Sequence, residues 1–413
     1  MNELNKKGEI AKKSAQQLIS RTHKINTALL KMADALESNA SYIITENKKD
    51  LDNAQKNNMN IQLQDRLLLN EERIAQIALG IRQVADLDSP LGKVLHTASR
   101  PNGLKIEKIS VPLGVIGIIY EARPNVTADA AVLCLKSGNA VILRGGKEAL
   151  YSNMAIVKIL VEAAKSAGLP EGCIQLVEDT SRESAVGLMQ LNKYLDVIIP
   201  RGGAGLIRSV MENATVPAIE TGTGNCHIYV DATADLAMAE NITVNAKTSR
   251  PSVCNAAEKL LVHEAIAEKF LPKVLAALTA KGVEIRGCQK TCEIYSTAVP
   301  ITEEEWELEY FGMIMGVKVV KNVDDAINHI NNYSSKHSEA IVTGSTENGE
   351  KFLAEVDSSS VYVNASTRFT DGFEFGLGAE IGISTQKVHA RGPMGLGELT
   401  STKYVIRGEG QIR

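Results

Sequence analysis

Apolar residues in the first ninety positions recur with the spacing of a helix. Two sets fall three or four residues apart, one within 25–36 and one within 74–84: Ile25, Leu29, Met32, Ala33 and Leu36, and then Ile74, Ile77, Ala78, Ile81 and Val84. This spacing places each set on one face of an α-helix. Asn70 stands directly before two glutamates and is a suitable N-cap for the second helix. We therefore expect residues 9 to 90 to be mainly helical.

From residue 109 onward, short apolar runs alternate with helical stretches. The expected strands of this part are 111–120, 140–143, 174–177 and 196–199, with helices at 130–136 and 153–167. A second cycle has expected strands at 259–263, 313–320, 340–343 and 360–363, with helices at 264–281 and 323–332. Continuous apolar strands between helices are typical of a parallel sheet that is covered on both faces. The sequence thus predicts an α/β fold with two doubly wound domains that meet within 220–231, where a ligand cleft is expected.

Composition narrows the possible functions. The chain has 413 residues, of which 44% are hydrophobic and 4% aromatic, and its formal net charge is -4. Without a basic stripe and stacking aromatic residues, nucleic acid is not an expected partner. No apolar run is long enough to cross a membrane, and the polar first residues do not resemble a secretory signal. The six cysteines are scattered, and Cys288 and Cys292 lack further ligands nearby, so we expect a reducing cytoplasm and no metal site.

Cys254 is the strongest candidate for chemistry. It follows a polar loop that contains Pro251 and precedes small residues at the start of a possible helix, with Lys247 and Arg250 close in sequence. Nearby cations and a helix N-terminus favour the thiolate, which is the nucleophilic form of cysteine. The alternative is an inert packing cysteine, the commoner role in such chains. The polar surroundings favour the nucleophile.

Other polar clusters lie in glycine- or proline-containing loops. They occupy 120–127 (YEARPNVT), 217–227 (PAIETGTGNCH), 309–312 (EYFG), 363–372 (VNASTRFTDG) and 383–395 (ISTQKVHARGPMG). A glutamate with a glycine-rich turn, a later cysteine and a Glu-x-Phe-Gly motif, in this order, resemble the aldehyde dehydrogenase superfamily. Over essentially the whole chain, the motifs are most similar to the gamma-glutamyl phosphate reductases of that superfamily. Ser249 departs from them, because a glutamine commonly stands there.

The resemblance implies reduction of L-glutamyl 5-phosphate by NADPH to L-glutamate 5-semialdehyde and phosphate, in proline biosynthesis. It assigns a thioester to Cys254 and an oxyanion contact to Asn125, beside the Cys254 backbone N–H. Glu220 orients groups, shuttles a proton or has a structural role. Four arginines in the matched motifs compete for the substrate's phosphate and carboxylate: Arg123, Arg250, Arg368 and Arg391. His227 and His389 are either acid–base or structural residues, and Cys226 resembles a packing position.

The expected cofactor is NADP. Arg144 and Lys147 follow a predicted strand where relatives that use NAD have an acid, so the 2′-phosphate of NADP is favoured over a merely solvated turn. The resemblance assigns Glu309 to the nicotinamide ribose. Gly202, in the turn 200–205, is the remaining expected cofactor contact.

Members of the superfamily dimerise through a β-hairpin and a C-terminal strand, so a homo-oligomer is expected. The predicted domains are a NADP-binding domain (1–98 and 113–231), a catalytic domain (232–390) and an oligomerisation element (99–112 and 391–413). No glutamate kinase domain is expected in the chain. A contact with a separate glutamate 5-kinase is a possible partnership, because it would protect the labile acyl phosphate. Two rival functions remain: an aldehyde dehydrogenase that forms acids or acyl-CoA, and a catalytically silent binding protein.

Overall fold

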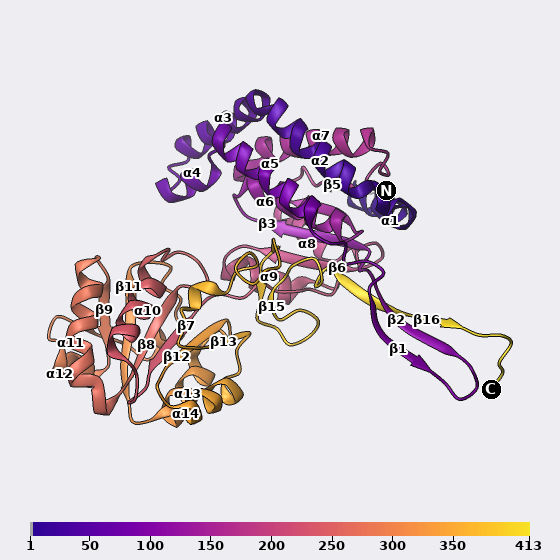
Figure 1. The fold of residues 1–413 in the computed structure, drawn as a ribbon. Coiled ribbons are helices and arrows are strands. Elements are labelled where there is room, and N and C mark those ends of the chain that lie inside the picture. The colour runs from indigo at the N-terminus through magenta and orange to yellow at the C-terminus, as the bar shows by residue number, and fades with distance from the viewer. Residues whose placement is uncertain (1–2) are drawn as a thin grey trace. The chain divides into compact units, whose positions relative to one another are not determined.

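The computed structural model describes residues 3–413 and divides them into two compact units (Figure 1). Unit 1 contains the chain up to Thr221 together with 376–382 and 394–413, and unit 2 contains 222–375 and 383–393. The division precedes the expected end of the first domain at residue 231, because strand β7 (Cys226–Val230) pairs with β8 (Ala257–His263) in the second sheet.

The N-terminal part of unit 1 is helical, as predicted. Both apolar stripes are buried, and the Asn70 side chain accepts a hydrogen bond of 2.8 Å from the Arg73 N–H, which confirms the expected cap. The helices are α1 (Glu3–Leu18), η1 (Ile19–Lys24), α2 (Ile25–Ser38), α3 (Ala40–Lys56), α4 (Ile61–Leu67) and α5 (Glu71–Asp86).

A parallel sheet of four strands, in the order β5-β4-β3-β6, forms the core of unit 1. The strands are β3 (Val115–Tyr120), β4 (Ala140–Arg144), β5 (Ile174–Leu176) and β6 (Val197–Arg201). The helices are α6 (Pro124–Lys136), η2 (Lys147–Ala149), α7 (Leu150–Ser166), α8 (Arg182–Met189) and α9 (Ala204–Asn213). The predicted strand 111–120 is divided in the structure: residues 111–112 end one strand and Val115–Tyr120 form another, because Gly114, at φ +129°, turns the chain between them. Helix α6 also begins earlier than predicted, with Pro124 in its first turn.

A separate antiparallel sheet in unit 1 joins distant parts of the chain. Its strands, in the order β1-β2-β16, are β1 (Val94–Ser99), β2 (Lys105–Pro112) and β16 (Thr400–Arg407). The hairpin is longer than the expected 99–112, since β1 already begins at Val94. Figure 1 shows the C-terminal strand in yellow beside β2.

Unit 2 is built on a seven-stranded parallel sheet in the order β10-β9-β11-β8-β7-β12-β13. Leu260 and Val262 of β8 pack into one core, whereas Leu261 packs into a second core on the other face. Both faces are therefore covered, as the continuous apolar strands predicted. The further strands are β9 (Glu284–Gly287), β10 (Val299–Pro300), β11 (Ile314–Val320), β12 (Ser338–Val342) and β13 (Ser360–Val363). The helices are α10 (Leu236–Thr248), α11 (Glu264–Ala280), α12 (Gln289–Ile294), η3 (Glu304–Trp306), α13 (Val323–Tyr333) and α14 (Thr346–Glu355).

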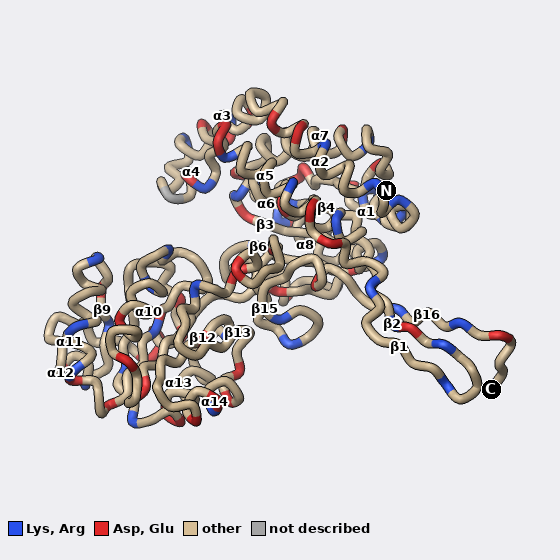
Figure 2. Tube along the Cα trace, viewed as in Figure 1, with Lys and Arg blue, Asp and Glu red and all other residues tan. Residues whose placement is uncertain are grey.

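The glycine-rich stretch 364–398 is mostly irregular. It contains the short helix η4 (Thr367–Phe369) and the paired strands β14 (Ile383–Ser384) and β15 (Gly392–Pro393). Acidic and basic residues are interspersed along both units (Figure 2). Within residues 3–413, no helix combines the length and the apolar character needed to cross a bilayer.

Candidate active site

Cys254 lies in the turn between α10 and β8 and is partly exposed. Helix α10 ends at Thr248, shortly before Arg250-Pro251, because a proline disfavours helical backbone in the residue before it. The possible helix start at Cys254 is not formed, because residues 254–256 continue the turn. The expected strand 259–263 is confirmed as part of β8, between β7 and β11. A helix N-terminus therefore does not act on the thiol.

The glycine-rich turn of the motif 217–227 packs directly against the loop that carries Cys254. A Cβ atom built on Gly224 would overlap the Cα, carbonyl carbon and carbonyl oxygen of Cys254. Only glycine permits so close an approach of two backbones. Cys226, two residues later, pairs in register with Ala257, so the Cys254 loop lies at the amino-terminal ends of β7 and β8.

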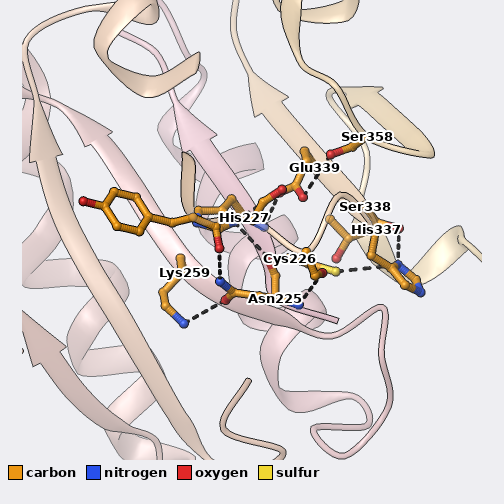
Figure 3. Close-up of polar contacts among 12 residues, drawn as sticks. Asn225, Cys226, His227, Lys259, His337, Ser338, Glu339 and Ser358 are labelled. Carbon is orange, nitrogen blue, oxygen red and sulfur yellow. Dashed lines mark hydrogen bonds and ion pairs between the residues drawn. The ribbon is translucent and has the colours of Figure 1, made fainter. Parts of the chain in front are cut away.

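The Cys226 thiol supports the Cys254 loop from inside unit 2. Its side chain is fully buried, and its Sγ donates a hydrogen bond of 3.1 Å to the Cys254 carbonyl oxygen. On its other side Sγ lies 3.8 Å from His337 Nδ1 (Figure 3). Burial raises the pKa of Cys226 well above the usual value for a thiol, so the proton needed for this hydrogen bond stays in place. Cys226 therefore supports the Cys254 loop as a buried hydrogen-bond donor.

Asn255 connects the same loop to η4. Its Nδ2 donates to the carbonyl oxygens of Arg368, at 3.2 Å, and Thr370, at 2.8 Å. In return, the Thr367 hydroxyl donates to the Asn255 carbonyl oxygen at 2.7 Å. These contacts hold the backbone of Arg368 close to the cysteine loop.

Ser249, the residue noted above as a departure from the resembling motif, binds the Arg368 guanidinium. Arg368 Nε donates to Ser249 Oγ at 3.0 Å. Burial lowers the pKa of Arg368, the nearby Arg250 cation lowers it further, and Cys254 opposes both effects. Through its contacts with Ser249 and Asn255, Arg368 lies near residues that neighbour Arg250 and Cys254 in the chain, and two guanidinium groups can attract an anion.

Two other cations predicted to act near the site are engaged elsewhere. Lys247, expected to favour the thiolate because it is close in sequence, is fully buried, and its Nζ lies 3.2 Å from Glu258 Oε2. Arg391 Nη2 lies 2.7 Å from Asp357 Oδ1, and Lys387 Nζ lies 2.8 Å from the other oxygen. Hydrogen bonds from Lys387 and Arg391 hold the pKa of Asp357 well below its usual range. Arg391 thus anchors the irregular segment 383–393 to Asp357.

His227 is part of a buried structural network. Its Nδ1 lies 2.9 Å from the Asn225 carbonyl oxygen and 3.2 Å from Glu339 Oε2, and its backbone N–H donates to the same carboxylate oxygen at 2.6 Å (Figure 3). Burial lowers the pKa of His227 to about 3, so the ring is neutral at physiological pH. His389, by contrast, is exposed in a left-handed conformation with φ +71°.

Glu309 lies in the loop between η3 and β11. Both of its carboxylate oxygens are buried and, among residues 3–413, they accept no hydrogen bond of normal geometry. Burial raises the pKa of Glu309 to about 7, against the opposing effect of the nearby Gly224 amide. A buried carboxyl group without such bonds is costly unless a partner completes it, and ribose hydroxyls are suitable donors.

Asn125 and Arg123 lie in unit 1, at the start of α6. Both are exposed, and Asn125 Nδ2 donates to Asp129 Oδ2 at 3.1 Å within the same helix. Burial raises the pKa of Asp129 to about 6. At the neighbouring strand end, Glu121 Oε1 accepts the Gly203 N–H at 3.0 Å, and a Cβ on Gly202 would meet the Glu121 carboxyl at 2.6 Å. Gly202 is thus needed for this close approach.

The remaining predicted residues of unit 1 differ in their surroundings. Arg144 Nη2 donates to the carbonyl oxygens of Thr180, at 2.7 Å, and Ser181, at 3.0 Å, so it holds a neighbouring loop. Lys147 is exposed in the turn after β4. Glu220 is partly exposed and stands next to Thr221, the last residue of the first segment of unit 1.

Several residues that shape the site were not anticipated from the sequence. They are Glu121, Asn225, Ser249 as an arginine partner, Asn255, Glu258 and Lys259. One signal was present: Glu258 and Lys259 interrupt a run of apolar residues in a strand that was expected to be buried. A charged pair at such a position must have buried partners.

Comparison with known proteins shows which family the chain belongs to. The aldehyde dehydrogenase family model matches residues 6–288 and 296–405. Gamma-glutamyl phosphate reductases of Clostridium botulinum (strain Eklund 17B / Type B) and Clostridium perfringens (strain ATCC 13124) are 60% and 61% identical, each over 100% of both chains.

Solved structures give the same result. The gamma-glutamyl phosphate reductase of Thermotoga maritima matches with a TM-score of 0.98 and 49% identity over 100% of both chains. An acetylating aldehyde dehydrogenase of Geobacillus thermoglucosidasius shares the fold, with a TM-score of 0.67 and 18% identity over 100% of this chain and 97% of that one. The chain therefore belongs to the aldehyde dehydrogenase family and, within it, to the gamma-glutamyl phosphate reductases, which are oxidoreductases of proline biosynthesis.

Proposed function

We propose that this enzyme reduces L-glutamyl 5-phosphate to L-glutamate 5-semialdehyde through a thioester on Cys254, with NADPH as the reductant. The observation that carries the proposal is the construction around Cys254: a loop supported by the Cys226 thiol and flanked by the cations Arg250 and Arg368. In the first step, the Cys254 thiolate attacks the acyl carbon, the carbon–oxygen bond to the phosphate breaks, and inorganic phosphate leaves. The products of this step are the thioester and phosphate.

When bound, NADPH supplies the hydride that reduces the thioester carbon. The oxyanion formed at that carbon needs donors, for which we propose the Cys254 backbone N–H and the Asn125 side chain. Asn125 would then exchange its contact with Asp129 for one with the substrate. Collapse of this oxyanion breaks the carbon–sulfur bond, which releases the aldehyde and restores the Cys254 thiolate. For Glu220 we propose an orienting or proton-shuttling role.

We assign the substrate's phosphate to Arg250 and Arg368, because they lie near the Cys254 thiolate, whose attack on the acyl carbon releases phosphate. Arg123, exposed at the start of α6, is our candidate for the amino-acid carboxylate. Arg391 contributes indirectly, since its guanidinium is bound by Asp357 and anchors the segment 383–393.

For the cofactor we propose roles for four residues. Glu309, with its buried carboxyl group, would accept the nicotinamide-ribose hydroxyls, and Lys147 would pair with the 2′-phosphate that distinguishes NADP from NAD. Gly202 would leave room for the dinucleotide beside Glu121, and Arg144 would shape the neighbouring loop.

We further propose a homo-oligomer that forms through the β1-β2-β16 sheet and acts in the cytoplasm. Large apolar side chains are exposed on this sheet: Val94, Leu95, Tyr404 and Ile406. Such a surface is typical of an interface. A contact with glutamate 5-kinase remains a hypothesis based on the lability of acyl phosphates. If a trapping nucleophile intercepts all of the acyl phosphate when both enzymes are present, that hypothesis fails.

The direct test is the reverse reaction: formation of NADPH from L-glutamate 5-semialdehyde, NADP and phosphate, with wild type beside Cys254→Ser. We expect turnover that requires phosphate and disappears in the variant. Steady oxidation without phosphate would instead indicate an aldehyde dehydrogenase that forms an acid. Full activity of Cys254→Ser would mean that the nucleophile is a different residue.

A further inference from the structure

Strand β8 carries two charged residues where an apolar pair would be expected. Glu258 and Lys259 are 1% and 0% exposed, and they follow Cys254 by only a few residues. Removing two charges from water costs several kcal/mol per ion unless partners compensate them. Their partners therefore indicate why the charges are there.

Lys259 joins two separate segments of unit 2. Its Nζ donates to Asn225 Oδ1 at 2.8 Å, as Figure 3 shows, and to the Leu308 carbonyl oxygen at 2.8 Å. The same Nζ lies 4.5 Å from the centre of the Tyr310 ring, a cation–π contact. The ammonium group thus reaches from the glycine-rich turn to the loop that carries Glu309.

Asn225 and Glu258 hold the same loop on either side of Leu308. Asn225 Nδ2 donates to the Trp306 carbonyl oxygen at 2.7 Å, and Glu258 Oε2 accepts the Tyr310 N–H at 3.2 Å. Glu258 is itself neutralised by Lys247, at 3.2 Å.

The backbone of this loop is consequently fixed at residues 306, 308 and 310. Glu309 lies between the last two contacts, and its carboxyl group is left without a hydrogen bond of normal geometry in the described part of the chain. We propose that Lys259, together with Asn225 and Glu258, is a positioning residue that holds the 306–310 backbone so that the Glu309 carboxyl group meets the nicotinamide nucleotide. This inference rests on the proposed cofactor contact of Glu309.

The arrangement has a consequence for the chemistry. Cys254 and the residues that hold the Glu309 loop, Glu258 and Lys259, belong to one continuous stretch, 254–259. This stretch leads into β8, the central strand of the sheet. A rigid strand positions groups more accurately than a loop does. Lys259 therefore acts on the 306–310 backbone, whereas the Cys254 loop at the start of the same stretch is held by a separate contact, from Cys226.

The test compares Lys259→Met with Lys136→Met. Lys136, in α6, is a matched control: it is 3% exposed, and its Nζ donates to an asparagine oxygen, Asn26 Oδ1 at 2.7 Å, and to a backbone carbonyl oxygen, Ala85 at 2.8 Å. Each variant is assayed for thermal stability, for NADPH affinity by fluorescence titration and for the rate at which iodoacetamide alkylates Cys254.

For Lys259→Met we expect the Kd for NADPH to rise by about tenfold or more, while the alkylation rate stays within about threefold of wild type. Lys136→Met should lower the melting temperature but leave the Kd unchanged. A folded Lys259→Met protein with a Kd within about twofold of wild type would overturn the inference. An equal rise in Lys136→Met would overturn it too, because the effect would then reflect only loss of a buried lysine.

Two further variants keep the test decisive. If Lys259→Met does not fold, Lys259→Gln replaces it, because glutamine is uncharged and too short to reach both acceptors. Wild-type affinity for NADPH in folded Lys259→Gln would again refute the inference.

Glu309→Gln separates the inference from the function on which it rests. If Glu309→Gln weakens NADPH binding and the Lys259 variants do not, only the inference fails. If Glu309→Gln binds NADPH like wild type, the proposed cofactor contact fails.

Discussion

Replacing Gly224 by alanine should disable the thiol while leaving the fold in place. The added Cβ would overlap the Cα, carbonyl carbon and carbonyl oxygen of Cys254, far inside the roughly 3.5 Å of a normal contact. Because all three atoms are backbone, no side-chain rotation relieves the overlap, and the two segments must separate by more than about 1 Å. The Cys226 hydrogen bond to the Cys254 carbonyl oxygen, now 3.1 Å, would then be lost or strained.

A displacement of this size is expected to lower kcat by about 100-fold, since a misplacement of about 1 Å at a reacting group costs that much. Overpacking of this kind should also cost about 1–3 kcal/mol in the free energy of unfolding. Steady-state kinetics of the reverse reaction and thermal denaturation measure the two effects. Gly80→Ala is the matched control, because its Cβ, in helix α5, meets nothing within 4 Å. That variant should keep full activity and gain up to about 1 kcal/mol in stability. Wild-type kcat in Gly224→Ala would refute this account of the glycine turn.

Three further predictions concern the supports of the site. Cys226→Ala should slow alkylation of Cys254 and lower the free energy of unfolding by about 1 kcal/mol or more, because it removes a buried donor. Cys226→Ser should retain much of the alkylation rate and of the stability, because its hydroxyl can still donate. Equal behaviour of the two variants would contradict a hydrogen-bonding role. Arg368→Ala should raise the KM for phosphate in the reverse reaction by about tenfold or more, and Ser249→Ala by less, since serine only orients the guanidinium; an unchanged KM in Arg368→Ala would remove that arginine from the phosphate site. Because the pKa of Asp357 is depressed in the folded state, its contacts stabilise the fold above the unfolded-state pKa of about 3.9 and are lost as pH falls through the lower folded-state value. Limited proteolysis within 383–393 should therefore increase in acid for wild type, and already at neutral pH for Asp357→Asn. Equal cleavage of the two proteins at neutral pH would count against the anchor.

The helices and most strands could be predicted from periodicity, because burial and secondary structure impose the same spacing on the sequence. The stripe from Ile25 to Leu36 and the apolar run Leu260–Val262 are clear cases. The errors fall where tertiary contacts decide. Small residues after Cys254 are compatible with the start of a helix, but residues 254–256 form a turn, and β8 begins at Ala257, where it pairs with β7.

Motif similarity located the important loops but not the partners of each side chain. Arg250 and Arg391 are both exposed arginines in loops, and sequence alone does not reveal that Asp357 binds one of them. Likewise, the burial of Lys259 follows from its place in a central strand, but its contacts with Asn225 and Leu308 join segments far apart in the chain. Such contacts depend on the completed fold, and no local pattern encodes them.

The most direct test of the central claim is a single-turnover measurement without phosphate. Enzyme mixed with L-glutamate 5-semialdehyde and NADP should produce a burst of NADPH equal to the number of active sites and then stop, and mass spectrometry of the quenched protein should place a glutamyl group on Cys254. Addition of phosphate should release that group and restart turnover. Continued turnover without phosphate, or a burst with Cys254 unmodified, would contradict the thioester mechanism.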